Sequence, residues 1–238
     1  QIGDGLRASG LPRKDVFLIS KLPPTCHGYV RADEGVRQML AELGTTYVDL
    51  CLVHFPGMYF PFEPTPGSIP DSDAFATVER AGTWRALEAA QQRGHCRHIG
   101  VSNYHTAHLE ELLEYARSPP VVNQIEHHPF NVDRDTVRFC RMHGIVVQAY
   151  GSINARGLLD EPVVHRIAEE VGRTPAQVLL RWALQEGAMV LPKSAREERI
   201  VSNARLWDFV LSPLQHNRLS ELNRFERSYL RTDDVGVG

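Results

Sequence analysis

Six short apolar segments, rich in β-branched residues, recur along the chain, and a segment with helical periodicity follows each of them. They are VFLIS (16–20), VDLCLV (48–53), HIGV (98–101), VVNQI (121–125), IVVQAY (145–150) and MVLP (189–192). Strands that are apolar almost throughout and alternate with helices are typical of a parallel sheet covered by helices. The pattern predicts an α/β fold with six strands.

Helix start signals and one proline-rich segment fill the intervals between these strands. Thr174 with Gln177, and Ser212 with Gln215, have the spacing of capping boxes, and each pair encloses a proline at the first helical position. Phe55–Gly82 contains five prolines and predicts one long loop. Loops of this length in compact domains are usually functional or mobile.

Composition bounds the classes of partner. The 238 residues suffice for one large α/β domain, and no repeat or flexible linker divides them, so we expect a single domain over residues 1–238. A net charge of −3 offers no basic field for nucleic acid or anionic lipid. No apolar run approaches the roughly 18 residues that a membrane span needs. Four scattered cysteines without a CxxC pair favour a reducing cytoplasm.

Polar side chains stand where the apolar segments end. They are Lys21, His54, Ser102, Asn103, Gln124, Tyr150, Lys193 and Ser194. Alone, each has an ordinary structural explanation, since a lysine after a strand is commonly just solvated and a histidine there is commonly a hydrogen-bonded structural residue. A parallel β/α barrel gathers its ligand site at the carboxyl ends of its strands. The recurrence at every strand end therefore predicts one site.

Two histidine clusters raise the alternative of a metal centre. His95, Cys96 and His98 lie close together in GHCRHIG, and His127 and His128 are adjacent. A zinc site requires ligands at defined spacings, and the sequence has neither a cysteine pair nor HExxH. We expect no metal, and a metal-dependent barrel hydrolase using these histidines is the corresponding alternative function.

Several motifs in order resemble the aldo-keto reductases of the aldose reductase type, over essentially the whole chain. The motifs are SKL (20–22), DLCLVHFP (49–56), GVSNY (100–104), NQIEHHPF (123–130), QAYGS (148–152) and LPKSAREERIVSN (191–203). The resemblance implies a (β/α)8 TIM barrel and NADPH-dependent reduction of aldehyde or ketone carbonyls to alcohols by hydride transfer. The substrate would be a small carbonyl compound, and a monomer is the family default.

The resemblance also implies roles for the residues at the ends of the first four segments. Lys21 matches the family's catalytic lysine, and His54 matches the histidine that helps to orient the substrate carbonyl. Ser102, Asn103 and Gln124 match the three residues that hydrogen-bond the nicotinamide carboxamide.

The later motifs correspond to the rest of the cofactor site. Tyr150 matches the aromatic residue on which the nicotinamide ring stacks. Lys193, Ser194 and Arg199 match the clamp on the adenosine 2′-phosphate, and Asn203 matches an adenine contact.

One departure from the family pattern lies beside this clamp, where Ser202 replaces a glutamate that contacts adenine. The phosphate clamp itself is intact, because Lys193 and Arg199 are six residues apart and both can reach a dianionic phosphate. This favours NADPH over NADH. The sequence has no GxGxxG, which argues against a Rossmann fold and agrees with a barrel.

The family's proton-donating tyrosine, and the aspartate that holds its lysine, precede the stretch that corresponds to QIGDGLRASGLP at the start of this chain. The first residue is Gln1 rather than methionine, and six strands are two fewer than the barrel requires. We therefore expect a fragment that lacks the first two β-strands of the barrel, binds the cofactor poorly and has little activity. Tyr29, Tyr59 and Tyr104 lie in no matching motif, and we expect none to substitute.

A second class of function remains open, in which the chain is a noncatalytic barrel that binds the cofactor and acts as a regulatory protein. The sequence upstream of Gln1 would separate the two, since a catalytic member carries the tyrosine and the aspartate there. The identity of the carbonyl substrate cannot be read from the sequence. Aromatic residues of the long loop, among them Phe55, Tyr59, Phe60 and Phe62, are as well explained by packing as by a substrate pocket.

Overall fold

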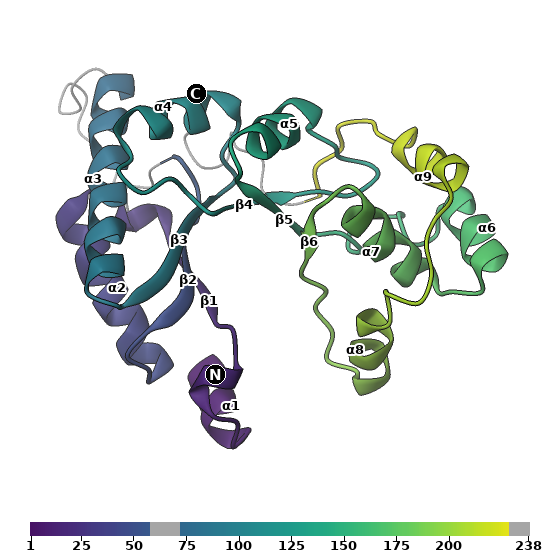
Figure 1. Ribbon diagram of the computed structural model, residues 1–238, viewed down its shortest axis with the longest axis horizontal. Helices are drawn as coiled ribbons and strands as arrows, with labels where there is room; N and C mark the ends of the chain where they lie inside the picture. The colour runs from purple at the N-terminus through teal and green to yellow at the C-terminus, as the bar shows by residue number, and fades with distance from the viewer. Residues whose placement is uncertain (58–71, 229–238) are drawn as a thin grey trace. The chain divides into compact units, whose positions relative to one another are not determined.

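The computed structural model describes residues 1–57 and 72–228 and has an α/β fold. Its six strands, β1 to β6, follow one another in the sheet in the same order as along the chain (Figure 1). This confirms the predicted α/β class and its six strands. The chain divides into two compact units, Gln1–Asn123 and Gln124–Arg231, with the boundary inside β4 (Val122–Glu126), and each unit is described by itself.

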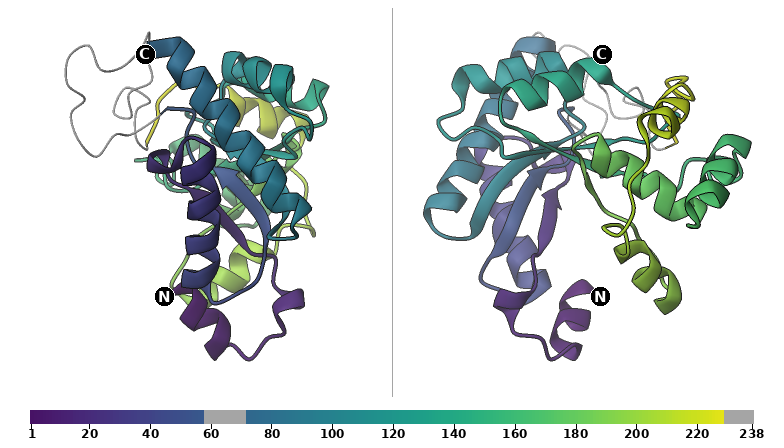
Figure 2. Two further views of the ribbon diagram at one scale, coloured as in Figure 1. Left: turned by 90° about the vertical axis from the view of Figure 1, so that its left-hand side faces the viewer. Right: turned by 45° about the vertical axis from the view of Figure 1, so that its right-hand side comes forward.

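The first unit is built around the first three strands, which are parallel to one another. Its elements are α1 (Ile2–Ala8), a 3₁₀ turn (Arg13–Asp15), β1 (Ile19–Leu22), a second 3₁₀ turn (Pro24–Cys26), α2 (Tyr29–Leu43), β2 (Val48–Val53), α3 (Ser72–Gln92), β3 (Cys96–Ser102) and α4 (Thr106–Tyr115). Figure 1 and Figure 2 show α2 and α3 side by side along these strands.

The core of this unit explains why the strands are apolar throughout. All six residues of β2 are buried, because neighbouring strands flank it and helices cover it. Leu50, Leu52 and Val122 form a buried cluster. Gly100 brings β3 close to the next strand, since a Cβ atom there would lie 2.6 Å from the carbonyl oxygen of Val122. The close approach leaves no room for any side chain at Gly100.

Two sequence predictions in this unit are wrong in their boundaries. The first strand begins at Ile19 rather than Val16, because the Arg13 guanidinium holds the Val16 carbonyl oxygen at 2.6 Å and keeps that residue out of the sheet. The predicted loop over 55–82 is interrupted by α3, which begins at Ser72, two residues after the last proline of the segment. The rest of the predicted loop, residues 58–71, lies outside the described residues.

The second unit continues from the end of β4 and packs its helices on one another. Its elements are α5 (Arg134–Met142), β5 (Val146–Tyr150), α6 (Pro162–Val171), α7 (Pro175–Gln185), β6 (Met189–Val190), α8 (Glu197–Ala204) and α9 (Pro213–Ser220). Strands β5 and β6 are parallel. Helix α7 contacts α6 and α8, and α9 contacts α6 (Figure 1).

Both predicted capping boxes are present in this unit and fix where two helices begin. The Thr174 side chain accepts from the backbone N–H of Gln177, and Ser212 accepts from Gln215 in the same way. Trp182 of α7 is fully buried. No helix within the described ranges is both long and apolar enough to cross a membrane.

Candidate functional site

Four of the predicted site residues meet at the carboxyl ends of the first three strands; we call Lys21, His54, Ser102 and Asn103 the strand-end group. Lys21 lies opposite Leu52 inside β1, rather than beyond the strand as predicted. His54 directly follows β2, and Ser102 is the last residue of β3. The parallel register therefore brings these side chains to one edge of the sheet.

Hydrogen bonds tie the three strand ends together. The backbone N–H of His54 donates to the carbonyl oxygen of Leu22 at 3.0 Å. The side-chain amide of Asn103 donates to the carbonyl oxygen of His54 at 2.9 Å and to Oγ of Ser102 at 3.1 Å. Asn103 has a φ of 63°, in the left-handed region, which asparagine adopts more readily than most residues. An asparagine at this turn is therefore suited both to the backbone and to the contact.

Charge and burial in this group favour a neutral imidazole. Burial, and then the nearby positive charge of Lys21, lower the pKa of His54 to about 4. Burial also lowers the pKa of Lys21. At neutral pH His54 is therefore uncharged and can donate one N–H to a ligand without carrying a full positive charge.

A further histidine supports this edge of the sheet and was not found from the sequence. His27 is buried, with Nδ1 3.1 Å from Oγ1 of Thr83 and Nε2 2.9 Å from the carbonyl oxygen of Phe55, the residue after His54. Because a carbonyl oxygen only accepts, Nε2 of His27 carries the proton and donates it. His27 has no sequence signal of its own, since its contacts come from residues distant in the chain.

Gln124 and Tyr150, predicted to contact the nicotinamide, lie on neighbouring strands of the second unit. The buried amide of Gln124 donates to Oε1 of Gln148 at 2.6 Å. The carbonyl oxygen of Tyr150 accepts from the backbone N–H of His127, and its side chain is half-buried. Gln148 thus orients Gln124. This role was not predicted from the sequence, because Gln148 lies in the largely apolar segment IVVQAY.

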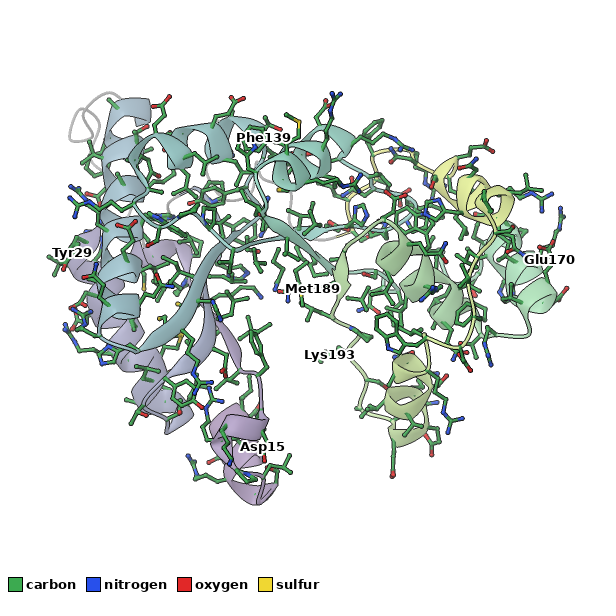
Figure 3. All side chains as sticks on the ribbon, in the orientation of Figure 1. Asp15, Tyr29, Phe139, Glu170, Met189 and Lys193 are labelled. Atoms are coloured by element: carbon green, nitrogen blue, oxygen red, sulfur yellow. The ribbon has the colours of Figure 1, made fainter. Side chains whose placement is uncertain are left out.

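The second unit also contains a cavity of about 380 Å³, which we call the cationic cavity. Every residue predicted to hold the adenosine end of the cofactor lines it, together with Ser202. The full lining is Ile153, Asn154, Leu159, Asp160, His165, Thr174, Pro175, Ala176, Lys193, Ser194, Arg199, Ser202 and Asn203. Figure 3 shows Lys193 on the segment between β6 and α8. Asp160, His165 and the start of α7 were not predicted to belong to this site.

The positive charges of this cavity have no acidic partner in the described part of the chain. No carboxylate oxygen of residues 1–57 and 72–228 lies within 4.0 Å of the charged nitrogens of Lys193 or Arg199. Arg173, close to the cavity in sequence, instead pairs with Asp208 at 2.7 Å. The N-terminal end of α7, which carries partial positive charge, forms part of the wall at Thr174–Ala176. The cavity therefore suits a phosphate dianion.

The adjacent residues His127 and His128 contact structural neighbours. His128 Nε2 lies 2.8 Å from Oε1 of Glu126, and the ring of His127 stacks on that of Trp182 with 5.1 Å between centroids. Within the described ranges no group of three His, Cys, Asp or Glu side chains could hold a metal ion.

Two of the three tyrosines considered as proton donors are described. Tyr104 is buried, and burial raises its pKa well above the ordinary value, which makes it a poorer acid. Tyr29 is about half-exposed at the start of α2 (Figure 3). Tyr59 lies outside the described residues.

The structure is thus a parallel α/β fold with polar groups at its strand ends and a cationic cavity. Proteins with parallel α/β folds commonly bind their ligands at the carboxyl ends of the strands. The sequence model described as "Aldo/keto reductase family" matches residues 1–224. The chain belongs to this family, whose members are oxidoreductases.

Individual relatives agree with this assignment. The chain is 37% identical to a glyoxal reductase of Bacillus subtilis (strain 168), over 98% of this chain and 78% of the relative. It is 34% identical to a 9,11-endoperoxide prostaglandin H2 reductase of Trypanosoma cruzi (strain CL Brener), over 95% of this chain and 74% of the relative. The crystal structure of MGS-M4, an aldo-keto reductase from a Medee basin deep-sea metagenome library, superposes with a TM-score of 0.85 at 29% identity, covering 99% of this chain and 81% of that chain.

Proposed function

We propose that this chain belongs to an NADPH-dependent oxidoreductase that reduces aldehyde or ketone carbonyls to alcohols. Family membership supports the reaction class. The observation that carries the cofactor assignment is the cationic cavity, in which Lys193 and Arg199 face no carboxylate within 4.0 Å in the described ranges. Two such charges in one cavity favour a ligand with a dianionic 2′-phosphate over one with a 2′-hydroxyl.

Within this proposal the cationic cavity holds the adenosine end of NADPH. Lys193, Ser194 and Arg199 bind the 2′-phosphate, and Asn203 contacts the adenine. Ser202, also on the wall, is neutral and adds no negative charge beyond that of Asp160, whereas a carboxylate at this position would oppose a phosphate.

The nicotinamide end of NADPH is assigned to residues that lie on or directly after β3, β4 and β5. Ser102, Asn103 and Gln124 bind the carboxamide, and Tyr150 provides the surface on which the ring stacks. The contacts within each unit support this assignment, because the amide of Gln124 is oriented by Gln148 and Asn103 is held against the end of β2.

The carbonyl substrate is assigned to Lys21 and His54. NADPH supplies the hydride when it is bound. The neutral imidazole of His54 donates a hydrogen bond to the carbonyl oxygen, on which negative charge grows, and the nearby charge of Lys21 stabilises the same oxygen. Small-molecule carbonyl compounds are the substrate class, and we propose that the protein works as a monomer in the cytoplasm, where its four free cysteines remain reduced.

We further propose that the six strands form part of a (β/α)8 barrel whose first two strands, with the tyrosine that delivers the proton and the aspartate that holds Lys21, come from sequence outside residues 1–238. The two Bacillus subtilis relatives, the glyoxal reductase and the oxidoreductase YtbE, are longer than the stretch that they share with this chain, which covers 78% and 72% of them. The 238-residue chain should then reduce an aromatic aldehyde far more slowly than about 1 per second, the lower end of ordinary turnover. Turnover at that rate or faster would refute the assignment of the proton donor.

Binding of two adenosine nucleotides to the 238-residue chain tests the cofactor assignment without turnover. By isothermal titration calorimetry, 2′,5′-ADP should bind at least about tenfold more tightly than 5′-AMP, because a charge-assisted contact is worth about 1.5–3 kcal/mol. Lys193→Met should remove most of this preference, and Lys14→Met, which changes an exposed lysine of the first unit, should preserve it. Equal affinity of the wild-type chain for the two nucleotides would contradict NADPH as the cofactor.

A further inference from the structure

His165 lies on the wall of the cationic cavity and belongs to none of the motifs that define the family resemblance. It is an exposed residue of α6, and it lines the same cavity as Lys193 and Arg199. The lining thus contains two cationic side chains, Lys193 and Arg199, one carboxylate, Asp160, and one imidazole. Histidine is the side chain whose charge ordinarily changes between pH 5 and pH 8.

The acidic groups near His165 do not neutralise it by direct pairing. Asp160 lines the cavity, and Glu161 and Glu169 lie one helical turn before and after His165 on α6. None of their oxygens lies within 4.0 Å of its ring nitrogens, and the same holds for every other carboxylate in the described ranges.

The charged groups on the helices packed against α6 are directed to other partners. Arg181 of α7 donates to the Leu206 carbonyl oxygen at 3.1 Å. On α9, His216 lies 3.1 Å from Glu186 and Arg218 lies 3.6 Å from Glu170. The other charged groups that line the cavity with His165 are Asp160, Lys193 and Arg199.

We propose that His165 is a third anion-binding residue of the cationic cavity, so that the preference for a 2′-phosphate over a 2′-hydroxyl rises as His165 gains a proton. The inference rests on the proposed function, because it assigns one more contact to the same phosphate. A protonated His165 adds a third cationic group to a cavity in which no described carboxylate lies within 4.0 Å of Lys193 or Arg199, and an exposed ion pair of this kind corresponds to up to about fivefold in affinity.

The test compares nucleotide binding by the wild-type chain, His165→Gln and His165→Lys at about pH 6 and about pH 8.5, the two sides of the ordinary histidine titration. At the lower pH, wild type should bind 2′,5′-ADP about three- to fivefold more tightly than His165→Gln, and at the higher pH the two should agree within about twofold. His165→Lys should bind tightly at both. Comparing variants at the same pH cancels the titration of the phosphate itself. Affinity for 5′-AMP should be the same in all three chains.

The control variant is His143→Gln, which changes an exposed histidine of the second unit that does not line the cavity, and it should behave as wild type at both pH values. If His165→Gln matches wild type at the lower pH while 2′,5′-ADP still binds better than 5′-AMP, the role of His165 is wrong and the cofactor assignment stands. If wild type does not distinguish the two nucleotides at either pH, the proposed function itself fails.

Discussion

The side-chain amide of Asn103 donates a hydrogen bond of 2.9 Å to the backbone carbonyl oxygen of His54. The two residues follow neighbouring strands, β3 and β2, so this contact fixes the turn at one strand end against the other. Asn103 makes it from a left-handed backbone conformation, with φ 63°. Asn103 therefore contributes in two separable ways, through the hydrogen bond of its side-chain amide and through its tolerance of the left-handed backbone conformation.

Substitutions of Asn103 separate these contributions. Asn103→Gly keeps the left-handed conformation without strain and loses the hydrogen bond, so we expect the free energy of unfolding to fall by about 1 kcal/mol. Asn103→Ala loses the bond and also forces a Cβ-bearing residue without a compensating contact into this region, so we expect a loss of about 2–3 kcal/mol. Urea unfolding measures both. An alanine variant as stable as the glycine variant would show that the backbone conformation costs nothing.

The pKa of His54 should depend on Lys21. Burial is the first cause that lowers this pKa to about 4, and the positive charge of Lys21 is the second. Lys21→Met removes the charge and retains most of the side-chain length, so the pKa of His54 should rise but stay below its ordinary value. NMR titration of the imidazole resonances, assigned with His54→Gln, measures the change.

The matched variant for this experiment is Lys14→Met, because Lys14 is exposed and lies outside the strand-end group. It should leave the titration of His54 where it is in wild type. A His54 titration that is equally unmoved by Lys21→Met would show that the two side chains do not interact.

The features predicted correctly from sequence are those coded by neighbouring residues. The six strands follow from local runs of apolar residues, and the capping boxes follow from pairs three residues apart, such as Thr174 and Gln177. The convergence of Lys193 with Arg199 on one cavity was also within reach, since both lie on one short segment after β6.

What the sequence did not reveal depends on contacts between distant segments. The late start of β1 involves Arg13, which bonds to Asp49, 36 residues away. The contacts of His27 with Thr83 and Phe55 span 56 and 28 residues. His165 sits in an ordinary amphipathic helix and joins the cationic cavity only because α6 packs beside α7. No local pattern encodes such partners.

Buried His27 should make the protein less stable in mild acid. Its pKa is lowered to about 4, first by burial, from an ordinary 6.5, so the unfolded chain binds a proton that the folded chain resists. The stability it contributes is complete above about pH 6.5 and declines as the pH falls toward 4. Between about pH 7.5 and about pH 5 this amounts to roughly 2 kcal/mol.

His27→Gln retains an N–H donor for the Phe55 carbonyl oxygen and cannot titrate. The difference in unfolding free energy between the two pH values, from urea denaturation, should therefore be about 2 kcal/mol smaller than in wild type. His98→Gln, at an exposed histidine, should leave that difference unchanged. If His27→Gln shows the full wild-type loss in acid, His27 is not the group that causes it.

The carboxylate of Glu126 should hold the chain near Ser228 in place. This buried side chain accepts from Nε2 of His128 at 2.8 Å and from the backbone N–H of Ser228 at 2.7 Å. Glu126→Ala leaves the buried imidazole of His128 without this acceptor, which costs about 1–3 kcal/mol, whereas the exposed Ser228 can bond to water instead. We expect a loss of about 1–3 kcal/mol in unfolding free energy and faster hydrogen exchange at the Ser228 amide.

Glu226→Ala is the matched variant, since the carboxylate of Glu226 pairs with Arg224 at 2.5 Å where both side chains are substantially exposed. Exposed pairs of this kind contribute about 0–1 kcal/mol, so this variant should unfold nearly as wild type does. Exchange at Ser228 separates an anchoring role from simple loss of stability, because it should accelerate under conditions in which core amides of α7 remain protected. If the Ser228 amide in Glu126→Ala exchanges no faster than in wild type, Glu126 does not anchor this segment.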